Sequence, residues 1–332
     1  MTVVRDKTAA KVFVTGANGF IGRHLCVHLA QLGCEVTALS RAAWRPHAGE
    51  TPPGEVLSRV RPAILPQISP ATDFRPWLSG HDAVVHLAGR AHVVEETAKN
   101  PREEFHRVNV ELTERIAGDA LTCGIGRFVY LSSVGVLGNR SAGDPFHRST
   151  PEGPVEDYAA SKLEAERRLR ARFAETNALV IVRPPLVYGR GAKGNFHRLM
   201  RLVQRLPVIP FGNVTARRSY VHVGNLCSFA SRCLDPAVPA GAYLVCDDEP
   251  VLLPDVLRLM AAEMSKRRWL LKLPPAVLRM AGTLAGRKED IDRLLSELIV
   301  DGEEDKRRTG WQPEFPPEDG IRDMVRHFAR AA

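Results

Sequence analysis

The chain has 332 residues, of which 44% are hydrophobic and 25% are charged. These values are ordinary for globular proteins, so the composition excludes a largely disordered chain and leaves one large domain or a domain with a smaller lobe. The formal net charge is +8, but the basic residues are scattered and no nucleic-acid recognition motif accompanies them. We therefore expect no nucleic-acid binding, and an anionic small ligand is the simpler use for some of these cations.

The six cysteines form no C-x-x-C pair and no metal-like cluster, and several lie inside apolar runs. This pattern predicts reduced, buried thiols in a cytoplasmic protein with no metal site. We expect neither a signal peptide nor stable membrane insertion, since no apolar stretch approaches the ~20 residues that span a bilayer. The basic and apolar run at Trp269–Leu273 could touch a membrane or a partner, although packing within the protein is the favoured interpretation.

Short apolar runs alternate with segments of helical periodicity over the first 190 residues. In chain order, the pattern predicts a strand at Lys11–Thr15, a helix at Ile21–Leu32, a strand at Val36–Ser40, a strand at Ala83–Leu87, a helix at Phe105–Cys123, a strand at Arg127–Ser132, a helix at Tyr158–Glu175 and a strand at Leu179–Arg183. Such alternation predicts an α/β protein with a doubly wound parallel sheet, covered by helices on both faces and joined by right-handed crossovers.

Two regions are less regular. Residues 42–76 are rich in proline, with a weak strand expected near Ala63–Ile68, and after Tyr188 glycine, proline and arginine become frequent. A strand at Ala242–Cys246 is expected to return to the main sheet. We therefore predict a dinucleotide-binding Rossmann domain from residues 1–189 and about 219–249. A substrate-binding lobe from 190–218 and 250–332 should cover the carboxyl edge of the sheet, where such folds bind ligands.

A glycine-rich segment, TGANGFIG at 15–22, lies between the first strand and the first helix. Gly16 permits the tight turn, Gly19 lets the backbone approach a pyrophosphate, and Gly22 permits close helix–strand packing. The strand–turn–helix setting favours dinucleotide binding over a turn that serves packing alone. The residues expected to contact the cofactor here are Gly16, Asn18, Gly19, Phe20, Ile21 and Gly22.

The second strand ends with Ser40 and Arg41, where proteins that bind NAD usually have an acidic residue for the adenosine ribose. An arginine at this point can hold a 2′-phosphate. NADP(H) is therefore the favoured cofactor and NAD(H) remains possible. The alternative interpretation of Arg41 is a surface charge.

Tyr158 and Lys162 are spaced to share one face of a helix, and Ser133 follows an earlier strand. A free tyrosine has a pKa of about 10, and a nearby ammonium group lowers it toward the range of acid–base catalysis. Together the three residues could act on a substrate C–O group while a nicotinamide exchanges hydride. A Y-x-x-x-K pair alone is common by chance, but its combination with the glycine-rich turn and Ser-Ser at a strand end favours catalysis.

With these motifs in place, the chain resembles the extended short-chain dehydrogenase/reductases, in the branch of nucleotide-sugar epimerases, dehydratases and reductases. The resemblance extends over nearly the whole chain. The matching segments are TGANGFIG (15–22), HLAG (86–89), VN (108–109), YLSSVGVLG (130–138), YAASK (158–162), RPPLVYG (183–189), RSYVHVGNL (218–226) and TGWQPEF (309–315).

The resemblance implies a role for each member of the catalytic group. Ser133 would orient the substrate oxygen and Tyr158 would be the acid/base. Lys162 would bind the nicotinamide ribose and tune Tyr158, and Asn109 would support the local helix and its hydrogen bonds. The further cofactor contacts that the resemblance implies are Leu87, Ala88, Gly89 and the backbone from Pro184 to Val187.

Asn195 and Arg218 match positions that grip a nucleotide diphosphate. The alternatives are a helix cap for Asn195 and a surface charge for Arg218. We expect His86, His92 and His222 to be structural. The chain departs from the family pattern at Gln67-Ile68, where an Asp often lies beside the adenine, at Gly224, which replaces a frequent acid, and at Leu137, which replaces a tyrosine.

Segments 191–196 and 206–212 resemble enzymes of bacterial O-antigen (lipopolysaccharide) sugar synthesis, including reductases of UDP-4-keto-6-deoxy-N-acetylhexosamines. This resemblance implies hydride delivery to a C4 ketone, with Tyr158 protonating the oxygen and Ser133 steadying it. The alternative is a UDP-hexose 4-epimerase with retained NAD, against which Arg41 argues mildly. A dehydratase would need a further acid/base pair beside Ser133.

A non-catalytic nucleotide sensor on the same fold is the hypothesis from another class. The resemblance also implies a homodimer that pairs through the helices Phe105–Cys123 and Tyr158–Glu175. These helices could instead simply cover the sheet.

Overall fold

In a computed structural model of the chain, which describes residues 9–47, 50–91, 100–141, 143–192 and 194–331, a seven-stranded parallel sheet forms the centre. The strand order is β11-β6-β5-β4-β1-β2-β3, so the order reverses beside β1. The strands are β1 (Lys11–Thr15), β2 (Glu35–Ser40), β3 (Val60–Ile64), β4 (Ala83–His86), β5 (Arg127–Leu131), β6 (Leu179–Arg183) and β11 (Gly241–Leu244). The predicted doubly wound Rossmann sheet, including the return of the 242–246 segment, is confirmed.

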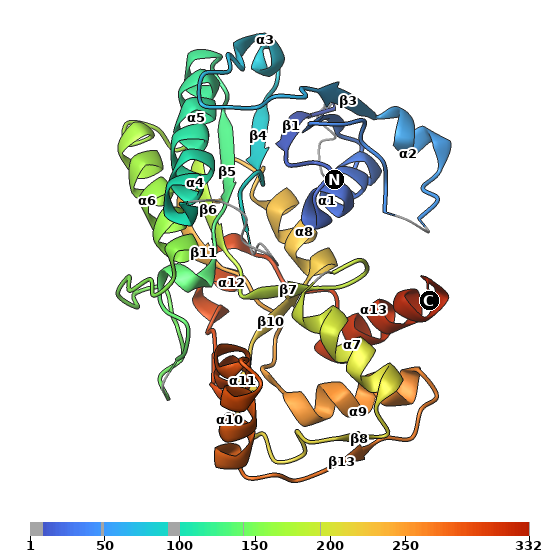
Figure 1. The fold of residues 1–332 in the computed structure, drawn as a ribbon. Helices are drawn as coiled ribbons and strands as arrows, with labels where there is room; N and C mark the ends of the chain where they lie inside the picture. Colours follow the sequence, from blue (N-terminus) through green and yellow to red (C-terminus); the bar gives the residue numbers. More distant parts are fainter. Residues whose placement is uncertain (1–8, 48–49, 92–99, 142, 193, 332) are drawn as a thin grey trace.

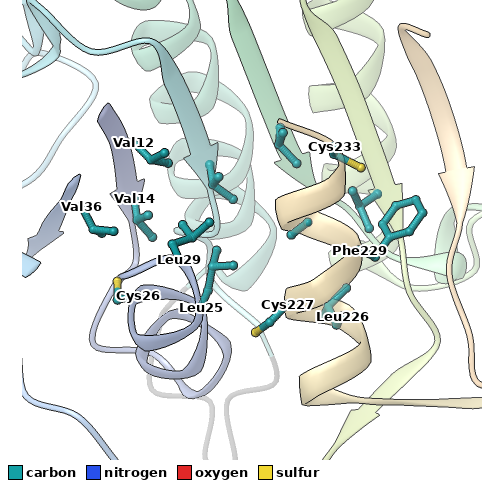
Figure 2. Packing of buried hydrophobic residues seen from close by; sticks show 14 of the residues in the cluster. Val12, Val14, Leu25, Cys26, Leu29, Val36, Leu226, Cys227, Phe229 and Cys233 are labelled. Atoms are coloured by element: carbon teal, nitrogen blue, oxygen red, sulfur yellow. The ribbon is translucent and has the colours of Figure 1, made fainter. Parts of the chain in front are cut away.

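Helices cover both faces of this sheet (Figure 1). Alternate residues of β1 point to opposite faces, as in any strand. Val12 and Val14 pack with Leu25 of α1 (Phe20–Gln31) and Phe229 of α8 (Val223–Arg232), as Figure 2 shows. Phe13 packs on the other face. There it joins the cluster formed by α3 (Arg75–Leu78), α5 (Leu112–Thr122) and α6 (Asp157–Arg172). An apolar layer therefore packs on each face of the sheet. The polar residues of the site lie at its carboxyl edge.

Two elements differ from the sequence expectation. The weak strand predicted near Ala63–Ile68 begins and ends earlier, as β3, and pairs only with β2 at the edge of the sheet. An edge strand tolerates Pro62, because its missing N–H faces away from the ladder. The helix predicted at Phe105–Cys123 begins at Pro101, where Asn100 caps it. It runs through α4 (Pro101–Phe105), the π-helical segment η1 (His106–Glu111) and α5.

The smaller lobe lies below the carboxyl ends of the sheet strands in Figure 1. Its core contains Phe196, Met200, Leu257, Met260 and Met324. Its helices are α7 (Asn195–Arg205), α9 (Leu253–Glu263), α10 (Pro275–Leu284), α11 (Lys288–Leu295) and α13 (Pro317–Ala331). Three short strand pairs lie outside the main sheet, namely β7 (Leu186–Tyr188) with β10 (Tyr220–His222), β9 (Arg217–Arg218) with β12 (Val251–Leu252), and β8 (Val208–Ile209) with β13 (Trp269–Leu270).

Residues 305–311, within the range predicted for the lobe, also contact the sheet and its helices. The backbone N–H of Leu244 in β11 donates to Asp305 of α12 (Glu303–Thr309) at 2.7 Å. Trp311 joins the cluster under α1 and α8. Within the described residues, no helix is both long and apolar enough to cross a bilayer.

Candidate functional site

The turn between β1 and α1 is built so tightly that only glycine fits at two positions. Gly16 has φ +68°, and a Cβ there would lie 2.8 Å from the nitrogen of Ala88. A Cβ on Gly22 would lie 2.3 Å from the oxygen of Gly16. Gly19 caps α1 without a side-chain hydrogen bond, and no acidic residue lies in the first helical turn. This cradle therefore offers the amide groups of a helix N-terminus to an anion, which fits the pyrophosphate of a dinucleotide.

Asn18 ties this cradle to the chain that follows β2. Its Nδ2 donates to the carbonyl oxygens of Ala42 at 3.0 Å and Ala43 at 3.1 Å, and its Oδ1 accepts from the backbone N–H of Arg45. Arg41 lies exposed at the start of this segment. The side chain of Asn18 thus fixes the loop where an adenosine ribose would lie. Phe20 and Ile21 are half-buried on the first turn of α1.

The end of β4 is held by a buried histidine. His86 bridges the hydroxyl groups of Thr15 at 2.7 Å and Thr113 at 2.9 Å, and burial lowers its pKa to about 3. The hydroxyl oxygen of Thr15 also accepts the backbone N–H of Ala88. A neutral imidazole therefore fixes segment 87–89 beside the glycine cradle, which agrees with the structural role expected for His86. The predicted structural His92 lies outside the described residues.

Lys162, Asn109 and Gly89 meet at the carboxyl edge of the sheet. The buried Nζ of Lys162 donates to the carbonyl oxygen of Leu131 at 2.8 Å. A Cβ on Gly89 would lie 3.3 Å from that Nζ and 3.1 Å from Oδ1 of Asn109. Asn109 donates to Ser161 at 2.9 Å and accepts the backbone N–H of Arg90 at 2.7 Å. The glycine after β4 thus leaves room for this ammonium group, and Asn109 links the segment after β4 to α6.

Tyr158 lies one helical turn before Lys162 on α6. Burial raises the pKa of Tyr158 to about 12 and lowers the pKa of Lys162 to about 8. The direction for Tyr158 is opposite to the sequence expectation, because removal from water disfavours the charged phenolate. At neutral pH the phenol therefore keeps its proton while the ammonium group is mostly charged. Ser133 follows β5 and accepts the backbone N–H of Gly135 at 3.1 Å, so its own O–H remains able to donate.

A buried carboxylate beneath this group was not singled out from the sequence. Glu166 is fully buried one turn after Lys162. It accepts the hydroxyl of Ser132 at 2.5 Å, Nη2 of Arg183 at 2.6 Å and Nη2 of Arg170 at 2.8 Å. Ser132 precedes Ser133 and Arg183 precedes Pro184, so one carboxylate joins three segments of the site. The available signal was an acid on the Lys162 face of the helix and an arginine ending a buried strand.

The segment after β6 also meets the serine loop. The carbonyl oxygen of Pro184 accepts the backbone N–H of Val134 at 2.9 Å. Val187 is half-buried in β7 and pairs with Val221 of β10. The predicted carboxamide-contacting segment therefore lies directly beside the residue that follows Ser133.

The predicted substrate residues lie in the lobe. Nη1 of Arg218 donates to the carbonyl oxygens of Arg293 at 2.8 Å and Ser296 at 2.7 Å, and burial lowers its pKa. Arg218 is therefore held at the end of α11 and is not a surface charge. Asn195 is exposed at the first position of α7, which has Gly194 as its N-cap, so it is not the helix cap.

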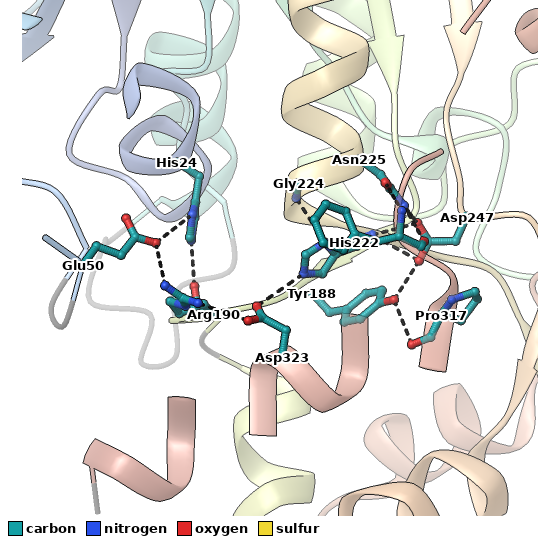
Figure 3. Close-up of polar contacts among 11 residues, drawn as sticks. His24, Glu50, Tyr188, Arg190, His222, Gly224, Asn225, Asp247, Pro317 and Asp323 are labelled. Carbon is teal, nitrogen blue, oxygen red and sulfur yellow. Dashed lines mark hydrogen bonds and ion pairs between the residues drawn. The ribbon is translucent and has the colours of Figure 1, made fainter. Parts of the chain in front are cut away.

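A second polar network joins the sheet to the lobe (Figure 3). Asp247 accepts the hydroxyl of Tyr188 at 2.8 Å, the backbone N–H of His222 at 2.9 Å and Nδ2 of Asn225 at 2.7 Å. His222 is buried, as expected for a structural residue. A Cβ on Gly224 would lie 2.8 Å from the Phe315 ring, so a larger residue here would require Phe315 to move.

Arg190 connects this network to α1, since Asp323 lies near both Arg190 and His222. Its guanidinium lies 3.4 Å from Glu50 and 3.1 Å from Asp323 of α13, and its carbonyl oxygen contacts His24 at 2.8 Å. This chain of contacts connects the dinucleotide-binding half with the last helix of the lobe. Among the described residues, no group of three or more His, Cys, Asp or Glu side chains is placed to hold a metal ion.

With this geometry established, comparison with known proteins gives a consistent result. The profile of the NAD dependent epimerase/dehydratase family matches residues 12–246. The UDP-glucose 4-epimerase of Vibrio cholerae is 32% identical over 329 residues, covering 98% of this chain and 97% of the relative. The GDP-6-deoxy-D-mannose reductase of Pseudomonas aeruginosa is 26% identical and covers 95% of this chain and 96% of its own length.

Solved structures agree in fold. MoeE5 in complex with UDP-glucose and NAD superposes with a TM-score of 0.76 at 21% identity, over 97% of this chain and 99% of that one. The UDP-N-acetylglucosamine 4-epimerase of Bacillus cereus gives a TM-score of 0.76 at 17% identity, over 97% and 100% of the two chains. At these identities the likeness concerns the fold.

Proposed function

The chain belongs to the NAD dependent epimerase/dehydratase family, and from this premise we propose that it reduces the C4 ketone of a UDP-4-keto-6-deoxy-N-acetylhexosamine. The observation that carries the proposal is the buried ammonium group of Lys162, one helical turn after Tyr158, next to Gly89 and the glycine cradle that fits a dinucleotide. We place this reaction in the cytoplasm, in the synthesis of O-antigen sugars.

The residues present fit a nicotinamide dinucleotide. The cradle of Gly16, Gly19 and Gly22 would hold the pyrophosphate, Lys162 the nicotinamide ribose, and the backbone from Pro184 to Val187 the carboxamide. When bound, the reduced nicotinamide supplies the hydride that adds to C4. We propose NADPH as the preferred donor, because Arg41 occupies the position after β2 where a 2′-phosphate would lie.

The protein supplies the proton. Tyr158 keeps its proton at neutral pH, since burial raises its pKa to about 12. A protonated phenol is the form that a reductase needs, because the oxygen at C4 gains negative charge as hydride arrives. Ser133 can donate a hydrogen bond to the same oxygen, since its own lone pair is engaged by Gly135. Lys162, on the next helical turn, then offsets the charge left on the phenolate.

We propose that Arg218 and Asn195 contact the nucleotide diphosphate. Arg218 is held by neutral carbonyl groups, which do not cancel its positive charge, so it suits an anionic ligand.

We also propose a homodimer through the helices α5 and α6. Their outer sides carry ion pairs such as Arg168–Glu114 at 2.8 Å, so such an interface would be polar. A monomer in light scattering at micromolar concentration would contradict the dimer.

The second candidate function is a UDP-hexose 4-epimerase that retains NAD. It is favoured by the 32% identity with the Vibrio cholerae UDP-glucose 4-epimerase over almost the full length of both chains. The two functions need the same catalytic group and differ in whether the cofactor leaves after each turnover.

Identification of the cofactor separates these candidates. Purified protein is denatured and the released nucleotide is quantified. An empty site that binds NADPH more tightly than NADH, with turnover of a 4-keto UDP-sugar, supports the reductase. One NAD⁺ per chain, with interconversion of UDP-hexoses, supports the epimerase. Arg41→Ala should weaken NADPH binding but not NADH binding, and Arg61→Ala on the exposed edge strand is the matched control.

A further inference from the structure

One end of the lobe exposes large apolar side chains that the proposed reaction does not use. Trp269 in β13 is 77% exposed, and on α10 Met280 is 61% and Leu284 is 84% exposed. Leu271 and Val277 are exposed as well. Aromatic and aliphatic groups of this size are normally buried, and clusters of them on a surface mark a contact with a partner or a lipid phase.

The elements that carry these residues are adjacent in the chain and lie at one end of the molecule. In Figure 1, β13 runs along the bottom of the view, and the chain continues into α10 at the lower left. Trp269 pairs with Val208 of β8, whose side chain is also exposed. The strand pair and the helix together form what we call the basal surface, defined by Val208, Trp269, Leu271, Val277, Met280 and Leu284.

The helix α10 has apolar residues on more than its packed side. Only Leu278 and Gly282 are buried, and a Cβ on Gly282 would lie 2.6 Å from Ile291 of α11. This narrow stripe is the contact with the rest of the lobe. Val277, Met280 and Leu284 follow one another at helical spacing on the exposed side, and Arg279 is the only charged residue of the helix.

The charge around the basal surface is mainly positive, and the nearby acids Glu289, Asp290 and Asp292 lie on α11. From Met264 to Lys288 the sequence has seven basic residues and no Asp or Glu. They are Lys266, Arg267, Arg268, Lys272, Arg279, Arg287 and Lys288. Arg268 is bound to the end of α7 through the carbonyl of Val203, and Arg279 lies 3.3 Å from Asp292. Lys266, Arg267, Lys272, Arg287 and Lys288 are all exposed.

We propose that the basal surface docks on an anionic lipid bilayer, with α10 lying in the interface and Trp269 at the level of the headgroups. An apolar helix face flanked by lysine and arginine, with a tryptophan beside it, is the combination that binds such a surface without crossing it. A second copy of the chain fits less well. A symmetric contact through this surface would bring the same seven basic residues together, with only Glu289, Asp290 and Asp292 of α11 near enough to pair with them. The docking is independent of the reaction proposed above.

Flotation with lipid vesicles tests the proposal. The full chain is mixed with vesicles of phosphatidylglycerol and phosphatidylethanolamine, or of phosphatidylcholine alone. We expect binding to the anionic vesicles only, with a loss as salt screens the charges. In anionic vesicles that contain brominated lipid, quenching of tryptophan fluorescence should occur and should be lost in Trp269→Phe. Trp44 and Trp311 are buried in the protein and should not respond.

Exposed positions allow matched variants that leave the core intact. Trp269→Ser with Leu284→Ser should reduce the vesicle partition coefficient by about tenfold or more. Lys272→Glu with Arg287→Glu should reduce it by a further comparable factor, at roughly fivefold for each cation removed. Leu32→Ser and Arg61→Glu change exposed residues on the dinucleotide-binding half and should leave the coefficient unchanged.

Three results would overturn the proposal. One is an absence of flotation with anionic vesicles, and another is equal binding to phosphatidylcholine. The third is a dimer in light scattering that the Trp269→Ser and Leu284→Ser changes convert to a monomer, because the basal surface would then be an interface between copies of the chain.

Discussion

Glu166 and Asp247 are both buried carboxylates at the carboxyl end of the sheet, yet different kinds of groups stabilise their negative charges. Glu166, under the catalytic group, accepts hydrogen bonds from Arg170 and Arg183 as well as Ser132. Asp247, at the junction with the lobe, accepts from a phenol, a backbone amide and the side chain of Asn225. Burial raises the pKa of Asp247, and the hydrogen bonds oppose that shift only in part.

The difference indicates how each region works. Beneath the catalytic group, fixed opposite charges hold the strand ends and α6 in place, and Glu166 also supports the charge on Lys162. At the junction, the donors to Asp247 among the described residues are neutral groups of β7, β10 and α8. Removal of Glu166 should therefore lower the free energy of unfolding more than removal of Asp247, because only the loss of Glu166 leaves buried arginine charge without its partner.

The largest effect should come from Glu166→Ala. It leaves Arg183 buried with Glu152 as its remaining carboxylate, at 3.1 Å. We expect the free energy of unfolding, measured by urea titration, to fall by roughly 3 to 5 kcal/mol. Glu166→Gln should lower kcat more than it raises KM, because Ser133 and Lys162 lose their alignment. Glu164→Gln changes a half-exposed acid on the same helix and serves as the control, with a loss below about 1 kcal/mol.

Asp247→Asn should have a smaller effect. The amide NH2 of asparagine would replace one carboxylate oxygen that now accepts hydrogen bonds. Because this NH2 group cannot accept, at least one hydrogen bond is lost. Urea titration should show a loss of about 1 to 3 kcal/mol. Because this network joins the lobe to the sheet, KM for the nucleotide sugar should rise more than kcat falls. A loss as large as that of Glu166→Ala would contradict the contrast between the two networks.

The pH dependence of kcat/KM should reveal the ammonium group of Lys162. Burial lowers its pKa to about 8 in the free enzyme, so the charged form is present below that pH and is lost above it. We expect kcat/KM to fall by about tenfold per pH unit above pH ~8. Lys162→Arg should move or remove this limb, because arginine stays charged across the range. A flat profile up to pH ~10 would show that the ammonium group is not required.

The smallest effect should come from Arg190→Ala at the margin of the junction network. The ion pairs of Arg190 with Glu50 and Asp323 involve partly exposed groups, so we expect a loss of at most about 1 kcal/mol at neutral pH. His222 and Arg190 hold the pKa of Asp323 down at about 2. The stability that this carboxylate contributes is therefore present above its unfolded pKa and lost as the pH falls toward 2. Acid titration of stability should be shallower in Arg190→Ala.

The comparison also shows which parts of the site a sequence can predict. Local spacing in the sequence defines the glycine cradle and the pair Tyr158 and Lys162. The turn and the shared helix face could therefore be predicted from the sequence alone. Glu166 belongs to the same helix, but its partners Ser132 and Arg183 come from β5 and β6, and only the folded sheet brings them together. The protonation of Tyr158 was misjudged for a related reason, because burial is a property of the fold.

Other differences have local causes. The π-helical segment η1 carries Asn109 and could not be inferred from helical periodicity, which assumes a constant turn. The strand β3 was misplaced because Pro62 resembles a strand breaker, yet it lies on an edge where no hydrogen bond is needed. Asn18, which the motif predicts as a cofactor contact, also binds the backbone of Ala42 and Ala43 through its side chain, and this contact depends on the fold.

The most direct test of the central claim is single-turnover reduction of a 4-keto UDP-sugar by the Tyr158→Phe variant with bound NADPH. The variant lacks only the hydroxyl that would protonate the C4 oxygen. We predict that NADPH binding, followed by fluorescence, stays within about threefold, while the rate of hydride transfer falls by roughly 10² to 10⁴. An unchanged rate with intact binding would contradict the role of Tyr158 as proton donor and, with it, the proposed catalytic group.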